Sequence, residues 1–353
     1  MGLIRLLLAL SVVIAHSGNS FKILSNGSDC VQLFFIISGF YIFLILDKKY
    51  YKLSNSYYYF ITNRVLRIFP MYFAILFLAI SYALYSLKFS PRLPNDLAAY
   101  VAFWNQLEVK YLTLLITLNF TILGQEVLSF FSHVQDGPAL IFNPEGGILP
   151  QFILIPQAWS IGMEFWFYLL APFLFKMKNK QIVIIIIFLI ILKYLFLNEF
   201  SNSYNWMYRV HFFELVYFLL GGISYKLIKI KKSNPLTGKL IFIMIIIYVI
   251  FINLFAENLI FKWGTYLAFS LAIPVIFSLT GKLKIDKFLG DLSYPIYIIH
   301  ILIIAVAREF NIMSLELRLV FIILMSILTS YILNRFLNPI EKYRTARLPT
   351  KNN

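Results

Sequence analysis

Hydrophobic residues occur along this chain in long runs separated by short polar segments. The runs cover 2–17, 31–46, 68–87, 111–131, 158–175, 181–198, 209–228, 240–256, 263–280, 291–307 and 315–335. Most of them approach the roughly 20 residues that an α-helix needs to cross the hydrocarbon core of a membrane. The pattern therefore predicts an all-α, polytopic integral membrane protein.

The run at 111–131 differs from the others because it contains several polar side chains, among them Asn119, Gln125 and Glu126. If it crossed the membrane, every later cluster of basic residues would lie outside, against the bias of Lys and Arg towards cytoplasmic loops. We therefore expect a re-entrant or interfacial helical segment here, on the outer side. Ten transmembrane helices remain, with both termini in the cytoplasm.

Most of the 31 basic residues fall in segments that this arrangement places inside, which are 48–67, 176–180, 226–239, 282–287 and 335–351. The long hydrophilic stretch at 132–157 becomes an outer loop. We expect one transmembrane domain over 1–340, followed by a short basic cytoplasmic tail at 341–353. The first run lacks a basic leader and a small-residue cleavage site, so we interpret it as a retained span.

Composition agrees with this class, because 60% of the residues are hydrophobic and only 13% are charged. The formal net charge of +15 comes from short clusters between apolar runs and not from a basic domain, so we expect membrane orientation and no nucleic-acid partner. The single cysteine, Cys30, excludes an internal disulfide. No His or Cys spacing resembles a metal or redox motif, and we expect no metal.

The stretch QAWSIGMEFWFYLLAP at 157–172 places a carboxylate within an apolar run. Ser160, Glu164 and Tyr168 share one helical face at a spacing of four residues. Such a polar row is costly in hydrocarbon, which makes it a candidate for function. The alternative is a carboxylate that an Arg or His of a neighbouring helix holds for packing alone.

The first run contains Arg5 and His16, which are 11 residues apart. At 100° per residue they return to within about 20° of the same face, with a rise of about 16 Å. We therefore expect both to face one groove, with Arg5 near the cytoplasmic entrance and His16 deeper in the membrane. A membrane histidine alone is also commonly a hydrogen-bonding partner between helices.

Three further groups of polar residues are candidates for a structural or a functional role. Ser38 and Gly39 form a small patch that favours close helix packing. Arg64 and Arg67, in RVLRIFP, are spaced for one face and suit phosphate groups, although interfacial anchoring predicts arginines at the same place. Arg209, His211 and Glu214 cluster near the outer end of the 209–228 run, and His211 and Glu214 have the spacing of a structural pair.

The run GDLSYPIYIIH places Tyr297 and His300 in one span. Tyr297 is most simply a packing or interfacial aromatic residue. A buried His300 requires a polar partner.

Taken together, IRLLLALSVVIAH, FFIISGFYI, RVLRIFP, WSIGMEFWFY and LSYPIYIIH resemble the ordered motifs of the bacterial membrane acyltransferase-3 family. This family includes O-acetyltransferases of O-antigen and nodulation factors. The resemblance implies a ten-span protein of the bacterial cytoplasmic (inner) membrane. It implies transfer of an acetyl or other acyl group from acyl-CoA, as donor substrate, to a carbohydrate hydroxyl. Because some members carry an added periplasmic domain, a partner protein for the final transfer is an open question.

The same resemblance implies roles for individual residues. It makes His16 the catalytic histidine and Arg5 a functional arginine, and it assigns Arg64 and Arg67 to the acyl donor. Structural or active-site roles follow for Glu164 and His300.

The residue pattern and the resemblance agree on a polar groove that leads past arginines to a histidine. We expect His16 to act as a general base on the acceptor hydroxyl. Ser160, Tyr168 or a backbone N–H would stabilise the oxyanion, and Glu164 would orient His16 or hold a substrate hydroxyl. Two other classes are open, a proton-coupled secondary transporter and a flippase-like subunit of an envelope polysaccharide system. The sequence has no internal symmetry of the kind many transporters show.

Overall fold

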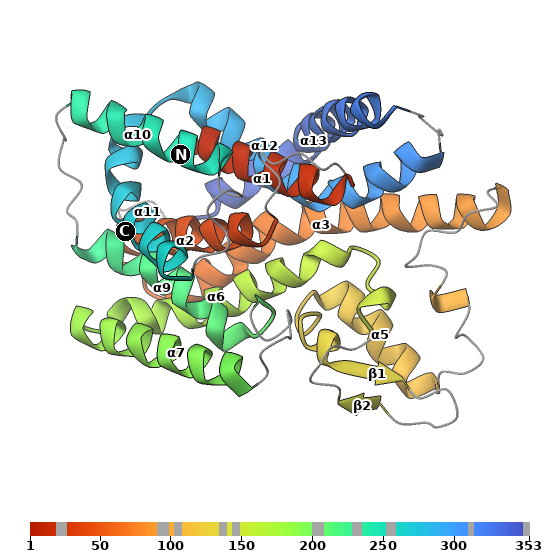
Figure 1. Ribbon diagram of the computed structural model, residues 1–353, viewed down its shortest axis with the longest axis horizontal. Coiled ribbons are helices and arrows are strands. Elements are labelled where there is room, and N and C mark those ends of the chain that lie inside the picture. The colour runs from red at the N-terminus through yellow and green to blue at the C-terminus, as the bar shows by residue number, and fades with distance from the viewer. Residues whose placement is uncertain are drawn as a thin grey trace.

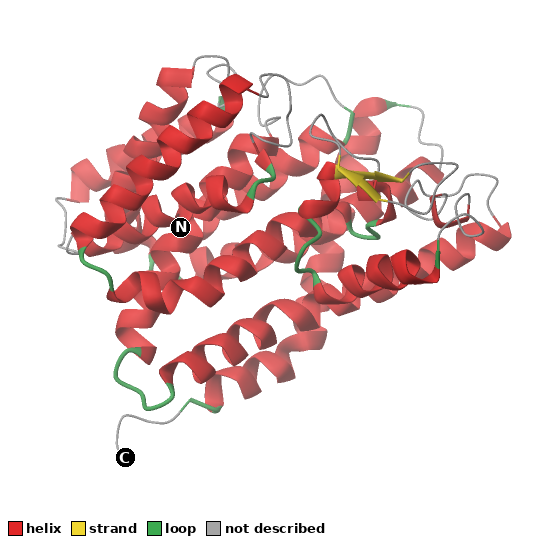
Figure 2. Ribbon diagram, turned by 90° about the horizontal axis from the view of Figure 1, so that it is seen from below, coloured by secondary structure: helices red, strands yellow, loops and turns green. Residues whose placement is uncertain are grey.

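The computed structural model of the protein describes residues 1–18, 27–89, 99–101, 108–133, 140–142, 149–199, 208–227, 235–251, 259–309 and 314–348. Parts of the predicted outer loop at 132–157 and of the predicted cytoplasmic segment at 226–239, and the end of the predicted tail, lie outside these ranges. Within them the helices lie side by side in one bundle, with two short strands at one side of it (Figure 2).

Ten long helices of the described ranges coincide with the ten predicted spans (Figure 1). They are α1 (Gly2–His16), α2 (Gly27–Ile45), α3 (Ser56–Phe89), α6 (Trp159–Lys176), α7 (Asn179–Glu199), α9 (His211–Leu227), α10 (Pro235–Ile250), α11 (Leu259–Thr280), α12 (Lys284–Glu309) and α13 (Leu315–Ala346). Seven of the helices in these ranges are long and apolar enough to cross a membrane, and α1 and α10 are shorter apolar helices. The predicted class, an all-α polytopic membrane protein, is confirmed.

The segment predicted as re-entrant or interfacial forms α5 (Val109–Thr121), whose 13 residues span about 20 Å and are too short to cross a bilayer. The Tyr72 hydroxyl of α3 donates to the Asn119 carbonyl oxygen at 2.5 Å. The chain then turns at Ile122 and Gly124, both with positive φ. A Cβ atom on Gly162 of α6 would lie 2.8 Å from the Ile122 carbonyl oxygen, so this turn requires glycine there. The tip of α5 thus packs against α3 and the first turn of α6.

Short elements connect this turn to α6. A 3₁₀ turn at Val127–Phe130 leads into β1 (Phe131–His133), which pairs antiparallel with β2 (Leu140–Phe142). Two further 3₁₀ turns, Leu149–Phe152 and Pro156–Ala158, precede α6. This irregular backbone lies beside the helices at one side of the molecule (Figure 1).

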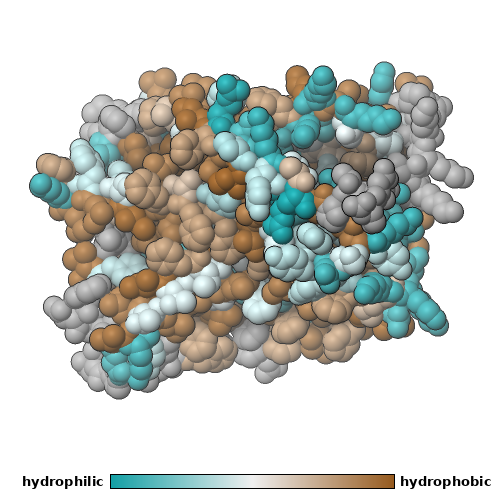
Figure 3. Space-filling view, turned by 180° about the vertical axis from the view of Figure 1, so that it is seen from behind, coloured by the Kyte–Doolittle hydropathy of each residue, from teal (hydrophilic) through white to brown (hydrophobic). Residues whose placement is uncertain are grey.

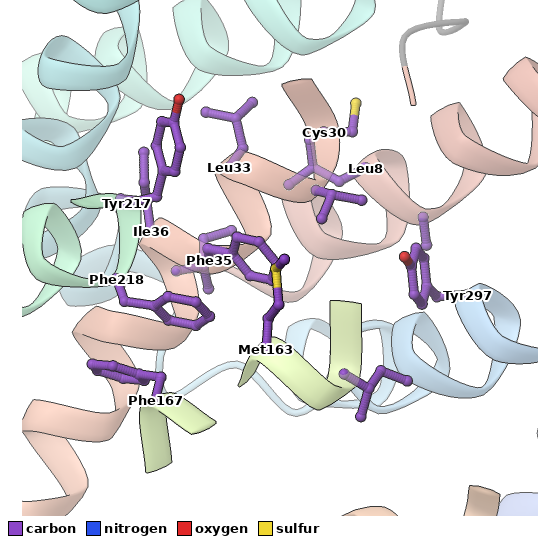
Figure 4. Close-up of a cluster of buried hydrophobic side chains, with 14 of the residues drawn as sticks. Leu8, Cys30, Leu33, Phe35, Ile36, Met163, Phe167, Tyr217, Phe218 and Tyr297 are labelled. Atoms are coloured by element: carbon purple, nitrogen blue, oxygen red, sulfur yellow. The ribbon is translucent and has the colours of Figure 1, made fainter. Parts of the chain in front are cut away.

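Close contact between α2 and α9 forms the centre of the bundle. A Cβ atom on Gly39 would lie 1.9 Å from the Phe218 carbonyl oxygen, and one on Gly221 would lie 1.8 Å from the Ile36 carbonyl oxygen. The predicted small-residue patch is therefore a packing contact, because only glycine permits this approach. Beside it the Phe218 ring stacks on Phe35 at 4.5 Å, as Figure 4 shows.

The two longest helices extend well past their hydrophobic runs. α3 has 34 residues and α13 has 32, so each extends about 50 Å, well beyond the roughly 30 Å of hydrocarbon. α3 begins 12 residues before the predicted run, so Arg64 and Arg67 lie within it. The first six residues of the predicted tail, Glu341–Ala346, are the last turns of α13 and not an extended segment.

Four polar contacts bring the predicted cytoplasmic segments together at one end of the bundle. The N-terminal ammonium pairs with Asp286 at 2.7 Å, and the Tyr225 hydroxyl donates to Asp47 at 2.6 Å. The Lys226 ammonium donates to the Met177 carbonyl oxygen at 2.5 Å, and the Arg347 guanidinium donates to Thr62 Oγ1 at 2.8 Å. This common end is what the ten-span arrangement requires.

Hydrophobic side chains also cover much of the outer surface, as Figure 3 shows for one face. Phe77, Phe173 and Leu236 are among the large side chains with more than half of their surface exposed. A water-soluble domain rarely exposes such continuous apolar surface, whereas lipid tails contact it without cost.

The topology is tested with single cysteines in a Cys30→Ser background. This substitution removes the native thiol, so that any labelling comes from the introduced cysteine. We expect Lys282→Cys to react with an impermeant maleimide only from the cytoplasmic side. Lys110→Cys, at the start of α5, is expected to react only from outside. Labelling of Lys282→Cys in intact cells would contradict the ten-span arrangement.

Candidate active site

His16 lies at the last position of α1, where its imidazole has a fixed orientation. Its Nδ1 lies 2.9 Å from the carbonyl oxygen of Val12. Because a carbonyl oxygen only accepts, Nδ1 carries the proton, and the lone pair of the neutral ring is on Nε2. The His16 side chain is exposed, so a ligand can contact its imidazole ring.

His300 of α12 lies beside His16, with the two ring centroids 5.1 Å apart. Its Nδ1 bonds to the Tyr297 carbonyl oxygen at 2.7 Å, which again puts the lone pair on Nε2. The His300 side chain is fully buried, and Nε2 has no hydrogen-bond partner within the described ranges. The polar partner that the sequence predicted for His300 is thus a backbone carbonyl.

A cavity of about 440 Å³, which we call the histidine cavity, lies in front of His16. Its polar and aromatic lining comes from α1, α2, α6, α12 and the segments before α6 and α9, namely His16, Ser28, Gln157, Trp159, Tyr208, Arg209 and Tyr297. The guanidinium of Arg209 lies over the Trp159 ring at 5.0 Å and donates to Ser129 Oγ at 2.6 Å. The Trp159 ring meets Tyr208 edge to face at 4.8 Å. Sequence analysis gave Gln157, Trp159 and Arg209 no role.

Gln157 connects α6 to α12 at the base of this cavity. Its side-chain amide donates to the Ile298 carbonyl oxygen. The backbone carbonyl oxygen of Gln157 accepts from Ser160 Oγ at 2.9 Å. The Ser160 and Tyr297 hydroxyls are 2.7 Å apart. Tyr297 is therefore a hydrogen-bonded member of the site as well as a packing residue.

Glu164 does not contact His16. Its Oε1 accepts from Ser38 Oγ at 2.6 Å and from the Tyr168 hydroxyl at 2.5 Å. The carbonyl of Val12 is the group that orients His16, because Glu164 lies further along α6. The predicted polar row is present, but the hydroxyl hydrogens of Ser160 and Tyr168 already have acceptors inside the protein.

These residues line a second, smaller cavity of about 60 Å³, which we call the middle cavity. Its polar lining is Arg5, Ser38, Ser160, Glu164, Ser293, Tyr294 and Tyr297. Ser38 therefore contributes a hydrogen bond to the site, in addition to its place beside the α2–α9 packing contact.

A third cavity of about 540 Å³, the arginine cavity, lies between α3, α12 and α13 at the end of the bundle where the predicted cytoplasmic segments meet. Its charged lining residues are Arg5, Arg67, Lys287, Arg335, Asp291 and Glu341. Four cations against two carboxylates give a net positive charge. Within the described ranges neither Arg5 nor Arg67 forms an ion pair with a carboxylate, so their charges are available to an anionic ligand.

Arg64 lies apart from Arg67 although the two are three residues apart in α3. It is buried, and its guanidinium lies 5.6 Å from the centroid of Phe60 and 5.8 Å from that of Tyr168. It is not part of the lining of the arginine cavity. The structure therefore separates two arginines that the sequence analysis treated as one pair.

The three cavities lie in a row along α1. The arginine and middle cavities share Arg5 and Tyr294, and the middle and histidine cavities share Val31 and Tyr297. Arg5 lines the arginine and middle cavities and His16 lines the histidine cavity, so the two residues face different cavities of this row.

A second buried polar group, on α2, α7 and α9, lines none of these cavities. Lys193 pairs with Glu214 at 2.9 Å, and Gln32 donates to the same carboxylate oxygen at 3.3 Å. The predicted His211–Glu214 pair is wrong, because a lysine from the neighbouring helix neutralises the carboxylate. This ion pair links helices, and no described group of three or more His, Cys, Asp or Glu residues could hold a metal ion.

Comparison with known proteins identifies the family of this chain. A family model described as an acyltransferase domain, Acyl_transf_3, matches residues 1–335. A protein of Aquifex aeolicus (strain VF5), named only as an uncharacterized protein, is 28% identical over 207 residues, which is 55% of this chain and 91% of that protein. No solved structure matches. Since the family match covers residues 1–335, the chain belongs to the acyltransferase-3 family and is a multi-pass membrane acyltransferase.

Proposed function

We propose that this protein transfers an acetyl or other short acyl group from acyl-CoA to a hydroxyl of a cell-envelope or exported carbohydrate. His16 is the general base. The observation that carries this proposal is the tautomer of His16, whose Nδ1–H bonds to Val12 and whose Nε2 lone pair serves the histidine cavity. The row of cavities connects that base to a cationic site.

The arginine cavity is the donor site in this proposal. Coenzyme A carries phosphates, and Arg5 and Arg67 are the lining guanidiniums that suit them. Arg5 also lines the middle cavity, so it lies where the pantetheine arm leaves the phosphates. The rise of about 16 Å from Arg5 to His16 is a distance that an extended arm spans.

The histidine cavity is the acceptor site. Ligand pockets are typically aromatic with a few polar groups that fix orientation, and Trp159, Tyr208 and Gln157 provide both kinds here. Flat aromatic faces suit the apolar faces of sugar rings, and the polar groups suit hydroxyls. The acceptor therefore enters at the end of the bundle opposite the arginine cavity.

The chemistry balances with one base. His16 Nε2 takes the proton of the acceptor hydroxyl as its oxygen attacks the thioester carbonyl carbon. The C–S bond then breaks, and the imidazolium returns the proton to the departing sulfur. The products are an ester and free coenzyme A, with no net change in protons.

Localisation follows from the distribution of charge. The bacterial inner membrane, with both termini and the arginine cavity at the cytoplasmic face, satisfies the positive-inside rule. Acyl-CoA is then supplied from the cytoplasm.

The activity is tested with purified protein in lipid nanodiscs and acetyl-CoA labelled in the acetyl group. We expect label to become covalently attached to an envelope polysaccharide acceptor, with release of free thiol. A transporter or flippase-like subunit would leave the acceptor unlabelled, which would refute the proposed function.

The two arginines of α3 are expected to have different kinetic effects. Arg67→Ala should raise KM for acetyl-CoA about tenfold with little change in kcat, because a phosphate contact far from the reacting carbon stabilises ground and transition states alike. Arg64→Ala, which removes a cation packed between aromatic rings, should mainly lower thermal stability. Equal increases in KM for both variants would contradict this separation.

Replacement of the base is expected to abolish turnover without loss of folding. His16→Gln keeps polarity and approximate volume but cannot take up a proton at neutral pH. We expect kcat to fall by about 10² to 10⁴ while acetyl-CoA still binds. His211→Gln, a half-buried histidine outside the cavities, is the matched control and should retain activity. Near-normal turnover of His16→Gln would exclude His16 as the base.

A further inference from the structure

A polar stripe on the second half of α13 faces the arginine cavity. Tyr331, Asn334, Asn338 and Glu341 all line it, and their spacing of three or four residues places them on one face of the helix. The sequence analysis ended the last span near residue 335 and assigned the following residues no function. In the structure they form a wall of the cavity opposite Arg67.

This wall is fixed at both sides. The side-chain amide of Asn334 donates to the Asp291 carbonyl oxygen of α12 at 3.1 Å. Beyond the stripe, Arg347 donates to Thr62 of α3 at 2.8 Å. These bonds hold the end of α13 against the other two walls, so the stripe has a defined position relative to Arg67.

The side-chain amide of Asn338 is available to a ligand, unlike that of Asn334. It is exposed, and it makes no side-chain hydrogen bond within the described ranges. The next residue is Pro339, which lies inside the helix and has no N–H to donate to the carbonyl oxygen of Arg335. This turn of α13 therefore offers an amide donor, an amide acceptor and an extra carbonyl acceptor beside the cavity.

Such a set of groups is complementary to adenine. Adenine presents a ring-nitrogen acceptor next to an amino donor, and an asparagine amide pairs with that edge through two hydrogen bonds. Cations lie on the same cavity, since Arg335 and Lys287 line it together with Arg67. The volume of about 540 Å³ is within the usual range for a pocket that holds a ligand of nucleotide size.

We propose that α13 forms the nucleotide-binding wall of the donor site, with the Asn338 amide binding the adenine base of the acyl donor. Arg335 and Lys287 lie beside its phosphates. This rests on the proposed function and deepens it by naming the part of the donor that α13 recognises. It follows that the enzyme selects nucleotide-bearing thioesters and discriminates against acyl groups carried on pantetheine alone or on a carrier protein.

The test compares acetyl-CoA with acetyl-pantetheine, which has the same thioester and arm but lacks the nucleotide. The measured quantity is the ratio of kcat/KM for the two donors in nanodiscs. We expect Asn338→Leu to lower this ratio about tenfold, since one bidentate base contact contributes about 1–3 kcal/mol. Thr345→Val, on the same helix but outside the cavity, is the matched control and should keep the wild-type ratio.

A binding measurement removes the dependence on turnover. Adenosine 3′,5′-bisphosphate carries the base and ribose without the thioester arm, and its affinity is measured by titration calorimetry in detergent. We expect Asn338→Leu and Asn338→Ala to bind it at least fivefold more weakly than the wild type. The Ala variant adds neither bulk nor charge, so the test survives if the Leu variant does not fold.

The outcomes separate this inference from the proposed function. If both donors are used and Asn338→Leu leaves their ratio and the bisphosphate affinity unchanged, α13 does not bind the nucleotide although the acyltransferase proposal stands. If neither donor is used by the wild type, the proposed function fails. Bisphosphate binding that depends on Asn338 would still support a nucleotide site on α13.

Discussion

The cost of placing polar groups in hydrocarbon is the constraint on which this structure depends. Polar side chains within a membrane persist where a partner inside the protein satisfies them or where they serve a ligand. Glu164 is satisfied by two hydroxyl groups, and Glu214 is paired with Lys193. His16 and Arg67 remain exposed in cavities. That contrast separates residues that hold the helices together from residues that are available for chemistry.

One face of α1 lines all three cavities. Its period places Arg5 and His16 on one face, and its last turn supplies the carbonyl that fixes the imidazole. Close packing of α2 against α9 through Gly39 and Gly221 holds α2 in place, and α2 contributes lining to the histidine and middle cavities. A base whose tautomer is set by the backbone needs no carboxylate partner, which frees Glu164 to hold the middle cavity together.

Sequence alone predicted the ten helices, because hydropathy and helical period are local properties of the chain. It also predicted that Arg5 and His16 face one groove, whereas they line different cavities of one row. It could not separate Arg64 from Arg67, because a spacing of three residues does not say which neighbour each side chain meets.

The remaining parts of the site were missed for the same physical reason. Arg209 and Asn338 gain significance only from the cavities that other helices form around them. Arg209 stood out in the sequence only as a neighbour of His211 and Glu214, and Asn338 only as one polar residue after a hydrophobic run. Tertiary contacts, and not local pattern, decide such residues.

We propose that donor and acceptor reach His16 from opposite ends of the bundle. Proteoliposomes with one protein orientation, established by labelling of Lys282→Cys, are the test. Labelled acetyl-CoA is supplied on one side and the carbohydrate acceptor on the other. We expect transfer only when acetyl-CoA is on the side of the arginine cavity and the acceptor is on the side of the histidine cavity. Transfer that requires both substrates on the same side would refute the two-sided route.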